Sequence, residues 1–543
     1  MSLFDQILAA RGLSGDAARD FLQPNYDKKH DPFLLPDMEK AVERIVLARE
    51  RQEKVTIYGD YDIDGLTATT VMLDALRSFG FKDVDAFIPN RFVEGYGLTV
   101  DAVKAIASQG SKLIITVDCG SLSHEEIKRA NELGVDVVVT DHHNVSDVQP
   151  PAIAVVNPKR KDHNYPFIDL AGVGVAFKLV QALQTRLPGL PLGAEKWMLD
   201  LVALGTVCDV VSLKDENRTN VFWGLKVLKK TRRPGLRALM AVAKVEPETL
   251  NSRSLGFALG PRMNAAGRLE TARHALDMLL AADNQLAYEK AEQLDALNQA
   301  RRADQTSILK EATLQAEQFI NEPVLVLSGP NWNHGIVGIV AAKLLEKYQK
   351  PTYVLQEMGE TSKGSARSFG GFSAVEAIRA ADDIILKGGG HTLAAGVTLP
   401  TTNIDAFRQR VNEFYKSLNL INQADLLLPK EDVLIKDFSE VTEELVVQLA
   451  SLEPFGSGNP EPILKISSVT VVDQRRMGAD NQHVKLEVKD ALGRRLQMLA
   501  FSAPAHFFAE PGEVVTVVFQ PTLNEWNGRR SVEGRLLHLV SDD

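Results

Sequence analysis

The chain has 543 residues, of which 45% are hydrophobic and 24% charged, a composition typical of soluble globular proteins. This length exceeds what one hydrophobic core usually supports, so we expect two or three domains. A net charge of −10 argues against a protein that coats nucleic acid by bulk attraction, but it is compatible with an enzyme that has a local basic groove.

The first third of the chain alternates short β-branched runs with amphipathic stretches. Nearly continuous apolar strands separated by helices indicate a parallel sheet that is covered on both faces. Residues 170–250 are predicted to be mostly helical, with Leu199–Cys208 as the most apolar run. The expected strands are Val55–Tyr58, Val84–Ile88, Leu113–Val117, Val135–Thr140 and Ile153–Val156, and the expected helices are Leu66–Phe79, Val100–Ser108 and Glu125–Leu133.

The stretch Leu269–Glu322 contains no glycine or proline and is rich in helix-forming residues. It predicts one long connecting helix, or two helices joined near Asp283–Asn284. After Pro323 the α/β pattern returns, with two loops expected at small-residue segments. The expected strands are Val324–Leu327 and Thr352–Leu355, the helix is Val337–Lys347, and the loops are Gly364–Ser368 and Gly388–His391.

The last part of the chain predicts five strands and no long helix. An OB-type β-barrel fits this count and commonly binds single strands, although any small barrel fits the pattern equally well. The strands are Ile463–Asp473, Val484–Val488, Leu496–Phe501, Val514–Phe519 and Val532–Leu539, with a turn at Asn527–Gly528. The predicted fold is therefore α/β with four parts: a parallel-sheet domain with an N-terminal extension (1–268), a helical connector (269–322), a second α/β domain (323–425) and the barrel (426–543).

Four acidic or imidazole clusters lie at the ends of predicted elements. In an open parallel sheet, ligands bind beyond the carboxyl ends of the strands, so clusters that follow strands should meet at one edge. The fourth cluster joins the others only if its helix packs at that same edge. The clusters are Asp60, Asp62 and Asp64; Asp118; Asp141, His142 and His143; and Asp209.

Each cluster alone has an ordinary structural explanation, because a single Asp after a strand is usually a turn or helix-cap residue. Three alternating aspartates, however, would repel strongly without a cation. A set of Asp and His without a thiolate suits Mn²⁺ or Mg²⁺. Two such ions, about 3.5–4 Å apart, can activate water and stabilise the attacking and leaving oxygens of phosphoryl displacement. The four clusters together predict a two-metal phosphodiesterase site.

The order of these motifs resembles the DHH phosphoesterase superfamily. The resemblance rests on Asp60-Tyr61-Asp62-Ile63-Asp64-Gly65, Val117-Asp118-Cys119-Gly120, Asp141-His142-His143 and Gly205–Asp209. The segment Gly389–Gly396 is similar to the glycine-rich signature of the companion DHHA1 domain. Gly260–Leu269 and Pro454–Pro462 are similar to segments of the RecJ family, the bacterial 5′→3′ exonucleases specific for single-stranded DNA. The resemblance covers nearly the whole chain.

The resemblance implies roles for individual residues. Asp118 would bridge both ions, Asp60 and Asp141 would support the ligands, and His143 would orient a ligand or contact a phosphate. Which histidine binds the metal stays open. The implied metal ligands are Asp62, Asp64, Asp118, His142 and Asp209, and the implied catalytic set adds His143.

Substrate-binding residues are implied in both α/β domains. Arg91 and Tyr96 follow the second strand, where they could hold a phosphate and stack on a base; a surface arginine and a packed tyrosine fit the residues equally well. Near the start of the connector, Arg262 and Asn264 would contact the substrate. In the second domain, Ser365 and Arg367 would bind a terminal phosphate, and Gly390 and His391 would donate N–H groups to an anion.

The implied activity is 5′→3′ hydrolysis of single-stranded DNA to mononucleotides in recombination and repair, with two Mn²⁺ or Mg²⁺ ions. The implied partners are a single-strand binding protein and a helicase, and a monomer is the simplest expectation. An enzyme of the same superfamily that cleaves short oligoribonucleotides or cyclic dinucleotides is the nearest alternative, but such enzymes generally lack the barrel. A manganese-dependent pyrophosphatase fits less well, and a non-catalytic scaffold would not need every ligand.

The remaining features concern location. Cys119 and Cys208 are too few and too far apart for a disulfide framework or a CxxC zinc site, so we expect small buried hydrophobes in a reducing, cytoplasmic setting. No apolar run is long enough to span a bilayer, and Met1–Asp5 does not resemble the start of a signal peptide. We therefore expect no membrane association.

Overall fold

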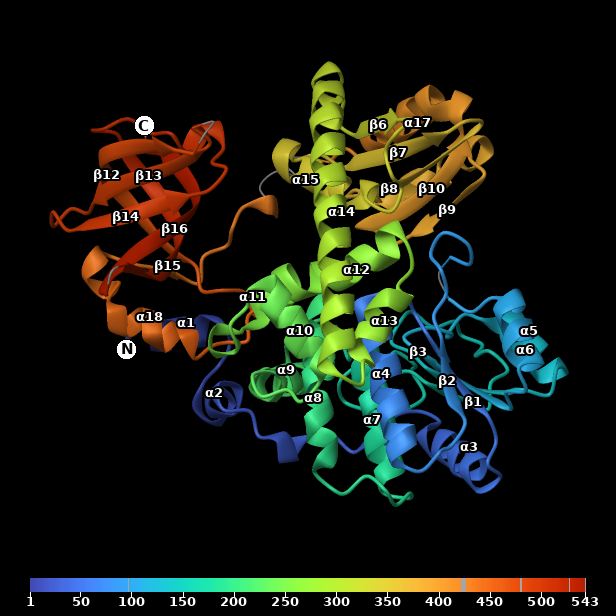
Figure 1. The fold of residues 1–543 in the computed structure, drawn as a ribbon. Coiled ribbons are helices and arrows are strands. Elements are labelled where there is room, and N and C mark those ends of the chain that lie inside the picture. Colours follow the sequence, from blue (N-terminus) through green and yellow to red (C-terminus); the bar gives the residue numbers. More distant parts are fainter. Residues whose placement is uncertain (96, 421–425, 479–480, 527, 543) are drawn as a thin grey trace. The chain divides into compact units, whose positions relative to one another are not determined.

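The computed structural model describes residues 1–95, 97–420, 426–478, 481–526 and 528–542, and they form two compact units (Figure 1). Unit 1 consists of Met1–Gly267, Ala272–Glu292 and Pro429–Asp543. Unit 2 consists of Arg268–Thr271 and Gln293–Leu428. Unit 1 contains a parallel sheet and a β-barrel, and unit 2 contains a mixed sheet; the two units are described separately.

A five-stranded parallel sheet forms the centre of the first part of unit 1. Its order is β2-β1-β3-β4-β5. Strands β1 and β3 are completely buried, which explains why their sequences are apolar almost throughout. The predicted parallel sheet is confirmed, with strand ends close to those expected. The strands are β1 (Val55–Gly59), β2 (Val84–Phe87), β3 (Leu113–Val117), β4 (Asp136–Thr140) and β5 (Ala154–Val156).

Helices cover both faces of this sheet (Figure 1). On one face, α5 (Val100–Ser108) and α6 (His124–Glu132) pack on a cluster that includes Ile114 and Val137. On the other, α4 (Ile63–Ser78) contacts β1, and α7 (Gly172–Gln184) contacts β3 and β4. Helix α8 (Leu199–Cys208) packs against both α4 and α7. Because α4 lies between the sheet and α8, nearly all of its residues are buried.

Further helices of unit 1 surround this core. The other helices up to the connector are α1 (Leu3–Ala10), α2 (Gly15–Leu22), α3 (Met38–Glu50), α9 (Asp215–Leu228), α10 (Pro234–Ala243), α11 (Ser252–Ser254), the π-helix Leu255–Leu259, α12 (Gly260–Leu269) and α13 (Arg273–Leu279).

The connector is two helices rather than one. Helix α13 ends at Leu279, and α14 runs over Asn284–Gln318. Between them the side chain of Asp283 accepts a hydrogen bond from Leu286 N at 2.9 Å, which caps the start of α14. The second of the two alternatives predicted for Leu269–Glu322 is therefore confirmed.

Unit 2 contains a mixed sheet of order β6-β7-β8-β10-β9, in which only the β6–β7 pair is parallel. Helices α14 and α15 (Val337–Tyr348) share a core on one face. A second core contains residues of α16 (Ala374–Arg379) and α17 (Ile404–Ser417). The strands are β6 (Leu325–Gly329), β7 (Thr352–Met358), β8 (Thr361–Arg367), β9 (Lys387–Gly390) and β10 (Ala394–Pro400).

Two loop predictions in unit 2 are wrong. Gly364–Ser368 was expected as a loop, but Gly364–Arg367 lies in β8, which pairs with both β7 and β10. Gly388–Gly390, also expected as a loop, forms β9 and pairs with β10. Small residues suit these strands because neighbouring backbones approach closely; a Cβ at Gly364 would lie 2.4 Å from Val354 O.

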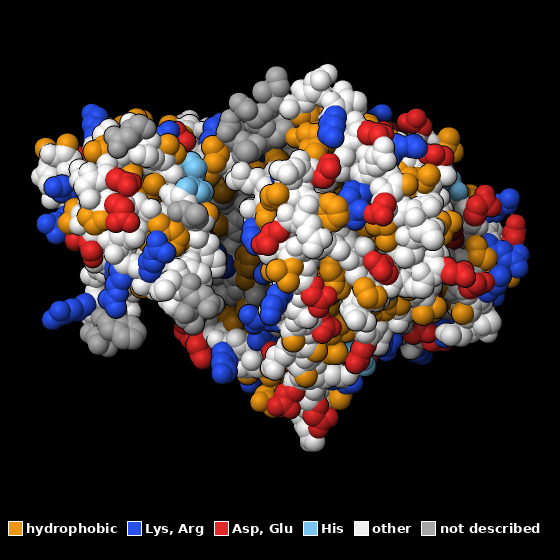
Figure 2. All heavy atoms as spheres, turned by 90° about the horizontal axis from the view of Figure 1, so that it is seen from above, with side chains coloured by type: hydrophobic (Ala, Val, Ile, Leu, Met, Phe, Trp, Pro, Cys, Tyr) orange, Lys and Arg blue, Asp and Glu red, His pale blue; other side chains and the backbone are white. Residues whose placement is uncertain are grey.

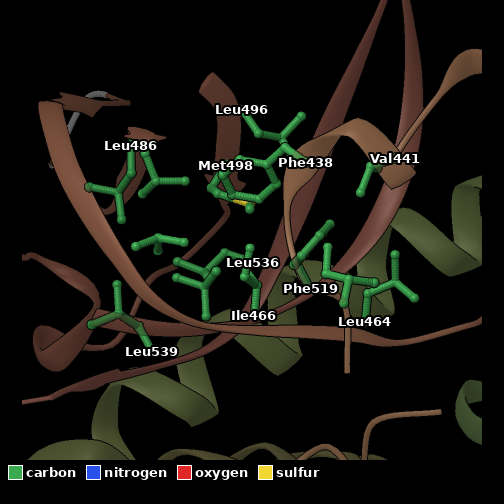
Figure 3. Packing of buried hydrophobic residues seen from close by; sticks show 14 of the residues in the cluster. Phe438, Val441, Leu464, Ile466, Leu486, Leu496, Met498, Phe519, Leu536 and Leu539 are labelled. Carbon is green, nitrogen blue, oxygen red and sulfur yellow. The ribbon is translucent and has the colours of Figure 1, made fainter. Parts of the chain in front are cut away.

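The C-terminal part of unit 1 is a closed five-stranded barrel, because β12 pairs with both β13 and β15. Its core holds Ile466, Leu486, Met498 and Phe519 among others (Figure 3). The OB-type prediction is confirmed, with the short strand β11 (Val433–Leu434) added beside β12. The strands are β12 (Leu464–Met477), β13 (His483–Lys489), β14 (Arg495–Ala500), β15 (Val514–Trp526) and β16 (Arg529–Ser541); α18 (Glu443–Ala450) precedes them, and Asn527 of the predicted turn lies outside the described residues.

Across the described part of the chain, every helix is either too short or too polar to cross a membrane. Figure 2 shows acidic and basic side chains interspersed on the visible face, so the net charge of −10 does not make that face uniformly acidic. Cys119 is buried and Cys208 partly exposed, and both are free thiols.

Candidate metal centre

The four predicted clusters meet at the carboxyl edge of the parallel sheet. Asp60 and Asp62 follow β1, and Asp62 Oδ1 caps α4 by accepting a hydrogen bond from Gly65 N at 3.1 Å. Asp64 lies in the first turn of that helix. Asp118 follows β3 with a left-handed φ of 62°, a conformation that aspartate tolerates better than most residues. Asp209 directly follows α8, whose packing on α4 brings it to the same edge.

His142 is the centre of this group. Its Nε2 lies 3.1 Å from Asp118 Oδ1, 3.6 Å from Asp209 Oδ2 and 3.7 Å from Asp64 Oδ2. Three sets of potential ligands each have their ligand atoms within 4.8 Å of one another. Asp118 and His142 each belong to two of the sets. The sets are Asp118 with His142 and His143, Asp64 with His142 and Asp209, and Asp60 with Asp62 and Asp118.

Unsatisfied polar atoms show that these residues fit a cation. Asp60 Oδ1, Asp118 Oδ1 and His142 Nε2 are buried and have no hydrogen-bond partner among the described residues. Buried polar atoms in folded proteins almost always have partners, because burial without one costs about 1–3 kcal/mol. Oxygen and imidazole donors without a thiolate suit a hard divalent ion. A bound cation would supply the missing partner for Asp118 Oδ1 and His142 Nε2, which belong to one of the three ligand sets.

The pKa shifts of the candidate ligands also indicate a cation site. Burial and the charge of Asp62 raise the pKa of Asp64 to about 7, and burial and the charge of Asp64 raise the pKa of Asp209 to about 9. Burial and the neighbouring aspartates also hold the pKa of Asp118 well above its usual value. Burial and the charge of His143 lower the pKa of His142 to about 3, which leaves its ring neutral, the form that binds metals. Carboxylates crowded in this way gain stability from a cation.

Asp141 organises the histidine pair. It accepts hydrogen bonds from the backbone N–H groups of Ser121, His142 and His143, and its Oδ1 lies 2.9 Å from His143 Nδ1. Burial raises the pKa of Asp141, but the hydrogen bond and charge of His143 outweigh it and hold that pKa below its ordinary value. Asp141 is therefore placed to fix the orientation of the second imidazole.

Several residues at this edge were not predicted from the sequence. The backbone N–H groups of Gly172 and Val173 donate to Asp64 at 2.6 and 2.8 Å. Asn157 Nδ2 donates to His143 O at 2.9 Å, and the charge of Lys159 lowers the pKa of Asp209 against the larger effect of burial. Asn157 directly follows β5, so its place at this edge could have been predicted in the same way as that of the other clusters. Gly172 acts through its backbone and leaves no side-chain signal.

Among the substrate-binding candidates of unit 1, Arg91 and the helix that carries Arg262 and Asn264 lie beside the segment that follows β1. The guanidinium of Arg91 stacks 4.3 Å from the ring of Tyr61, and its buried Nε has no hydrogen-bond partner among the described residues. Arg262 and Asn264 lie on α12, which approaches the segment Asp60–Asp62: a Cβ at Gly267 would be 3.3 Å from Tyr61 O. Tyr96 lies outside the described residues.

The candidates of unit 2 lie on β8 and at the end of β9, two strands that are separated by β10 in the sheet. Ser365 and Arg367 are two residues apart on β8, so their side chains share a face of the sheet. Arg367 lies beside the first turn of α15, where a Cβ at Gly338 would be 3.1 Å from Arg367 Nη2. Burial lowers the pKa of Arg367, so an anion there would stabilise its charge. Gly390 ends the exposed strand β9, and His391 follows it.

Comparison with known proteins places these features in a family context. Three family models match: the DHH family, N-terminal domain (residues 54–206), the DHHA1 domain (321–417) and the RecJ OB domain (434–538). The single-stranded-DNA-specific exonuclease RecJ of Bacillus subtilis is 38% identical, over 97% of this chain and 66% of its own length. That of Escherichia coli is 35% identical, over 92% of this chain and 89% of its own.

Solved structures agree with this result. The crystal structure of RecJ from Thermus thermophilus in complex with Mn²⁺ has a TM-score of 0.83 and 29% identity, covering 99% of this chain and 78% of that chain. The structure with Mg²⁺ from the same organism has a TM-score of 0.77 and 27% identity, covering 99% and 77%.

Proposed function

This chain belongs to the RecJ family of single-stranded-DNA-specific exonucleases, and from that premise we propose that it releases mononucleotides from the 5′ end of single-stranded DNA. The observation that carries the proposal is the cluster of Asp64, Asp118 and Asp209 around His142 Nε2, with distances between 3.1 and 3.7 Å. The relatives that are named as RecJ exonucleases, and the solved RecJ structures with Mn²⁺ and Mg²⁺, support metal-dependent cleavage of single-stranded DNA.

In the proposed mechanism, two divalent ions, Mn²⁺ or Mg²⁺, would be held by Asp62, Asp64, Asp118, His142 and Asp209. Asp118 would be shared between the two ions, because it belongs to two of the three ligand sets and, unlike the imidazole of His142, has two oxygens to donate. When bound, the ions supply Lewis acidity, which lowers the pKa of water and stabilises charge on phosphate oxygens. The chain's own contribution is orientation: the N–H groups of Gly172 and Val173 hold Asp64, and Asp141 holds His143.

We assign substrate binding to cationic and small residues in both units. Arg91, Arg262 and Asn264 would hold the strand near the ions, with Tyr96 stacking on a base. Ser365 and Arg367 would hold the terminal 5′ phosphate, and the N-terminal turn of α15 beside Arg367 favours an anion. Gly390 and His391 would donate further N–H groups. A pocket for a terminal phosphate would give the enzyme its direction.

The cellular role follows from the substrate. We propose that the chain acts as a monomer in the cytoplasm, in recombination and repair, where a helicase and a single-strand binding protein would supply and hold its substrate. The barrel supports this role, because OB-type barrels bind single strands by stacking and charge.

The test uses single-stranded DNA labelled at either the 5′ or the 3′ end. With Mn²⁺, we expect the 5′ label to appear at once as mononucleotide, while the 3′ label passes through a ladder of shorter strands. Asp118→Asn should abolish cleavage; asparagine also tolerates the left-handed φ of 62° at this position, so the fold should survive.

The matched control is Asp101→Asn, which makes the same chemical change at an exposed site on α5 and should leave the rate unchanged. A chelator should abolish cleavage by the protein without substitutions. If long strands survive while dinucleotides or cyclic dinucleotides are hydrolysed, the proposal is wrong and the chain is a short-substrate enzyme. Equal cleavage by Asp118→Asn would refute the metal assignment.

A further inference from the structure

A π-helical turn, Leu255–Leu259, leads into α12 and presents one large aromatic residue to solvent. Leu255 and Leu259 are fully buried, whereas Phe257 is 76% exposed. π-Helical turns are rare and are found frequently at functional sites, because they change the direction in which side chains project. A single exposed hydrophobic residue is ordinary on a protein surface, so the significance of Phe257 depends on the residues around it.

The buried side of this turn packs against the metal centre. Cys208, the residue before Asp209, donates its S–H to Leu255 O at 3.7 Å. A Cβ at Gly260 would lie 2.7 Å from Cys208 Sγ and 3.3 Å from Cδ1 of Ile63, the residue between Asp62 and Asp64. The buried side of the π-helical turn and the residue after it therefore contact two of the ligand-bearing segments, and the outer side of the turn carries Phe257.

The surroundings of Phe257 are cationic. The guanidinium of Arg253 lies 5.3 Å from the centre of its ring. Arg253 is exposed, and within the described residues no carboxylate lies within ion-pair distance of it. Arg262, a substrate-binding candidate, follows on α12. An exposed aromatic ring and a neighbouring arginine that has no carboxylate partner among the described residues form a combination that binds single strands, in which bases stack and phosphates meet positive charge.

We propose that Phe257 is a stacking platform for a base of the single-stranded substrate, with Arg253 contacting the adjacent backbone. This inference rests on the proposed function and adds a specific binding residue to it. Because every base has a flat face, such a platform grips DNA without reading its sequence. Stacking needs an unpaired base, so Phe257 also contributes to the preference for single strands over duplex.

The test compares Phe257→Ala, Phe257→Trp and the control Trp197→Ala. Trp197 is also an exposed aromatic residue under an arginine, 41% exposed with Arg232 4.0 Å from its ring, but it lies just before α8, at the end of that helix remote from Asp209. Binding of fluorescent oligothymidylate is measured in chelator, so that cleavage does not interfere. We expect roughly 10-fold weaker binding for Phe257→Ala, and unchanged binding for Phe257→Trp and Trp197→Ala.

Kinetics and base-specific fluorescence separate stacking from general damage. In Mn²⁺, Phe257→Ala should raise KM for long strands and leave kcat nearly unchanged. Oligomers with 2-aminopurine at successive positions should be quenched at a defined distance from the 5′ end, and Phe257→Ala should remove that quenching. Unchanged binding and quenching in Phe257→Ala, with normal activity of the unsubstituted protein, would refute the inference. Inactivity of the unsubstituted protein on single strands would instead refute the proposed function.

Discussion

Gly172 illustrates how a residue without a side chain can determine the metal centre. Its N–H donates to Asp64, and a Cβ at this position would lie 2.5 Å from Asp118 Oδ1 and 2.7 Å from Asp118 Cβ. Gly172→Ala should therefore displace Asp118 and weaken Mn²⁺ binding by roughly 10–100-fold, as loss of ligand support usually does. Isothermal titration calorimetry with Mn²⁺ measures the change in affinity.

Gly174→Ala is the matched control for this prediction. It lies on the same helix, and a Cβ there would approach Leu170 no closer than 3.4 Å, an ordinary contact. We expect normal Mn²⁺ affinity for Gly174→Ala and a normal melting temperature for both variants. Equal Mn²⁺ affinity of the two variants would contradict the role of Gly172.

At this scale, the sequence predicts side chains at strand ends and misses groups that act through the backbone. Asp62, Asp118 and His142 were predictable because parallel strands deliver their following residues to one edge. The donors to Asp64 come from residues 172 and 173, more than 100 positions away, and no local pattern indicates that approach. The proximity of Asp209 depended on the packing of α8 against α4, which hydrophobic periodicity alone does not specify.

At the scale of elements, α7 must be held firmly because its first turn carries those donors. Lys178 of α7 donates to Glu216 of α9 and to His30 O, and Tyr165 also donates to Glu216; the Lys178 and Glu216 side chains are both buried. Lys178→Met would leave a buried carboxylate without its cation. We expect a loss of roughly 3–5 kcal/mol in the free energy of unfolding, measured by urea denaturation.

The double variant Lys178→Met/Glu216→Gln tests the stated cause of that loss. Because it removes both charges, it should recover much of the lost stability. If the double variant is as unstable as Lys178→Met, lost packing rather than an unpaired charge is responsible.

Element prediction succeeded where burial imposes a simple pattern. The ends of α5 and β3 are as expected, since α5 is amphipathic and β3 is apolar except for one threonine. It failed at β8 and β9, where Gly and Ser favour a loop in isolation. Strand β8 is stabilised by pairing on both sides with β7 and β10, a tertiary effect that overrides local propensity.

At the scale of the whole molecule, the two ends of the chain share one core. Leu3, Ile7 and Leu8 of α1 belong to the same buried cluster as the barrel residues, and Arg11 donates to Asp432 and Asn459. The sequence gives no sign of this pairing, since more than 400 residues separate the partners. Ile7→Ala should cost roughly 2–5 kcal/mol in the stability of unit 1, measured by urea denaturation. Leu192→Ala, at a 91% exposed position, should cost little.

The division into two units predicts two steps of thermal unfolding. Each unit has its own sheet and core, so calorimetry should resolve two transitions, and Phe407→Ala, in the core of unit 2, should lower only one of them. The whole predicted metal centre lies in unit 1. Mn²⁺ at 100 times its Kd should therefore stabilise unit 1 by about 2.7 kcal/mol and raise only the melting temperature of that unit. Asp118→Asn should abolish that shift, whereas a shift of both transitions would show that Mn²⁺ stabilises unit 2 as well and would contradict the prediction.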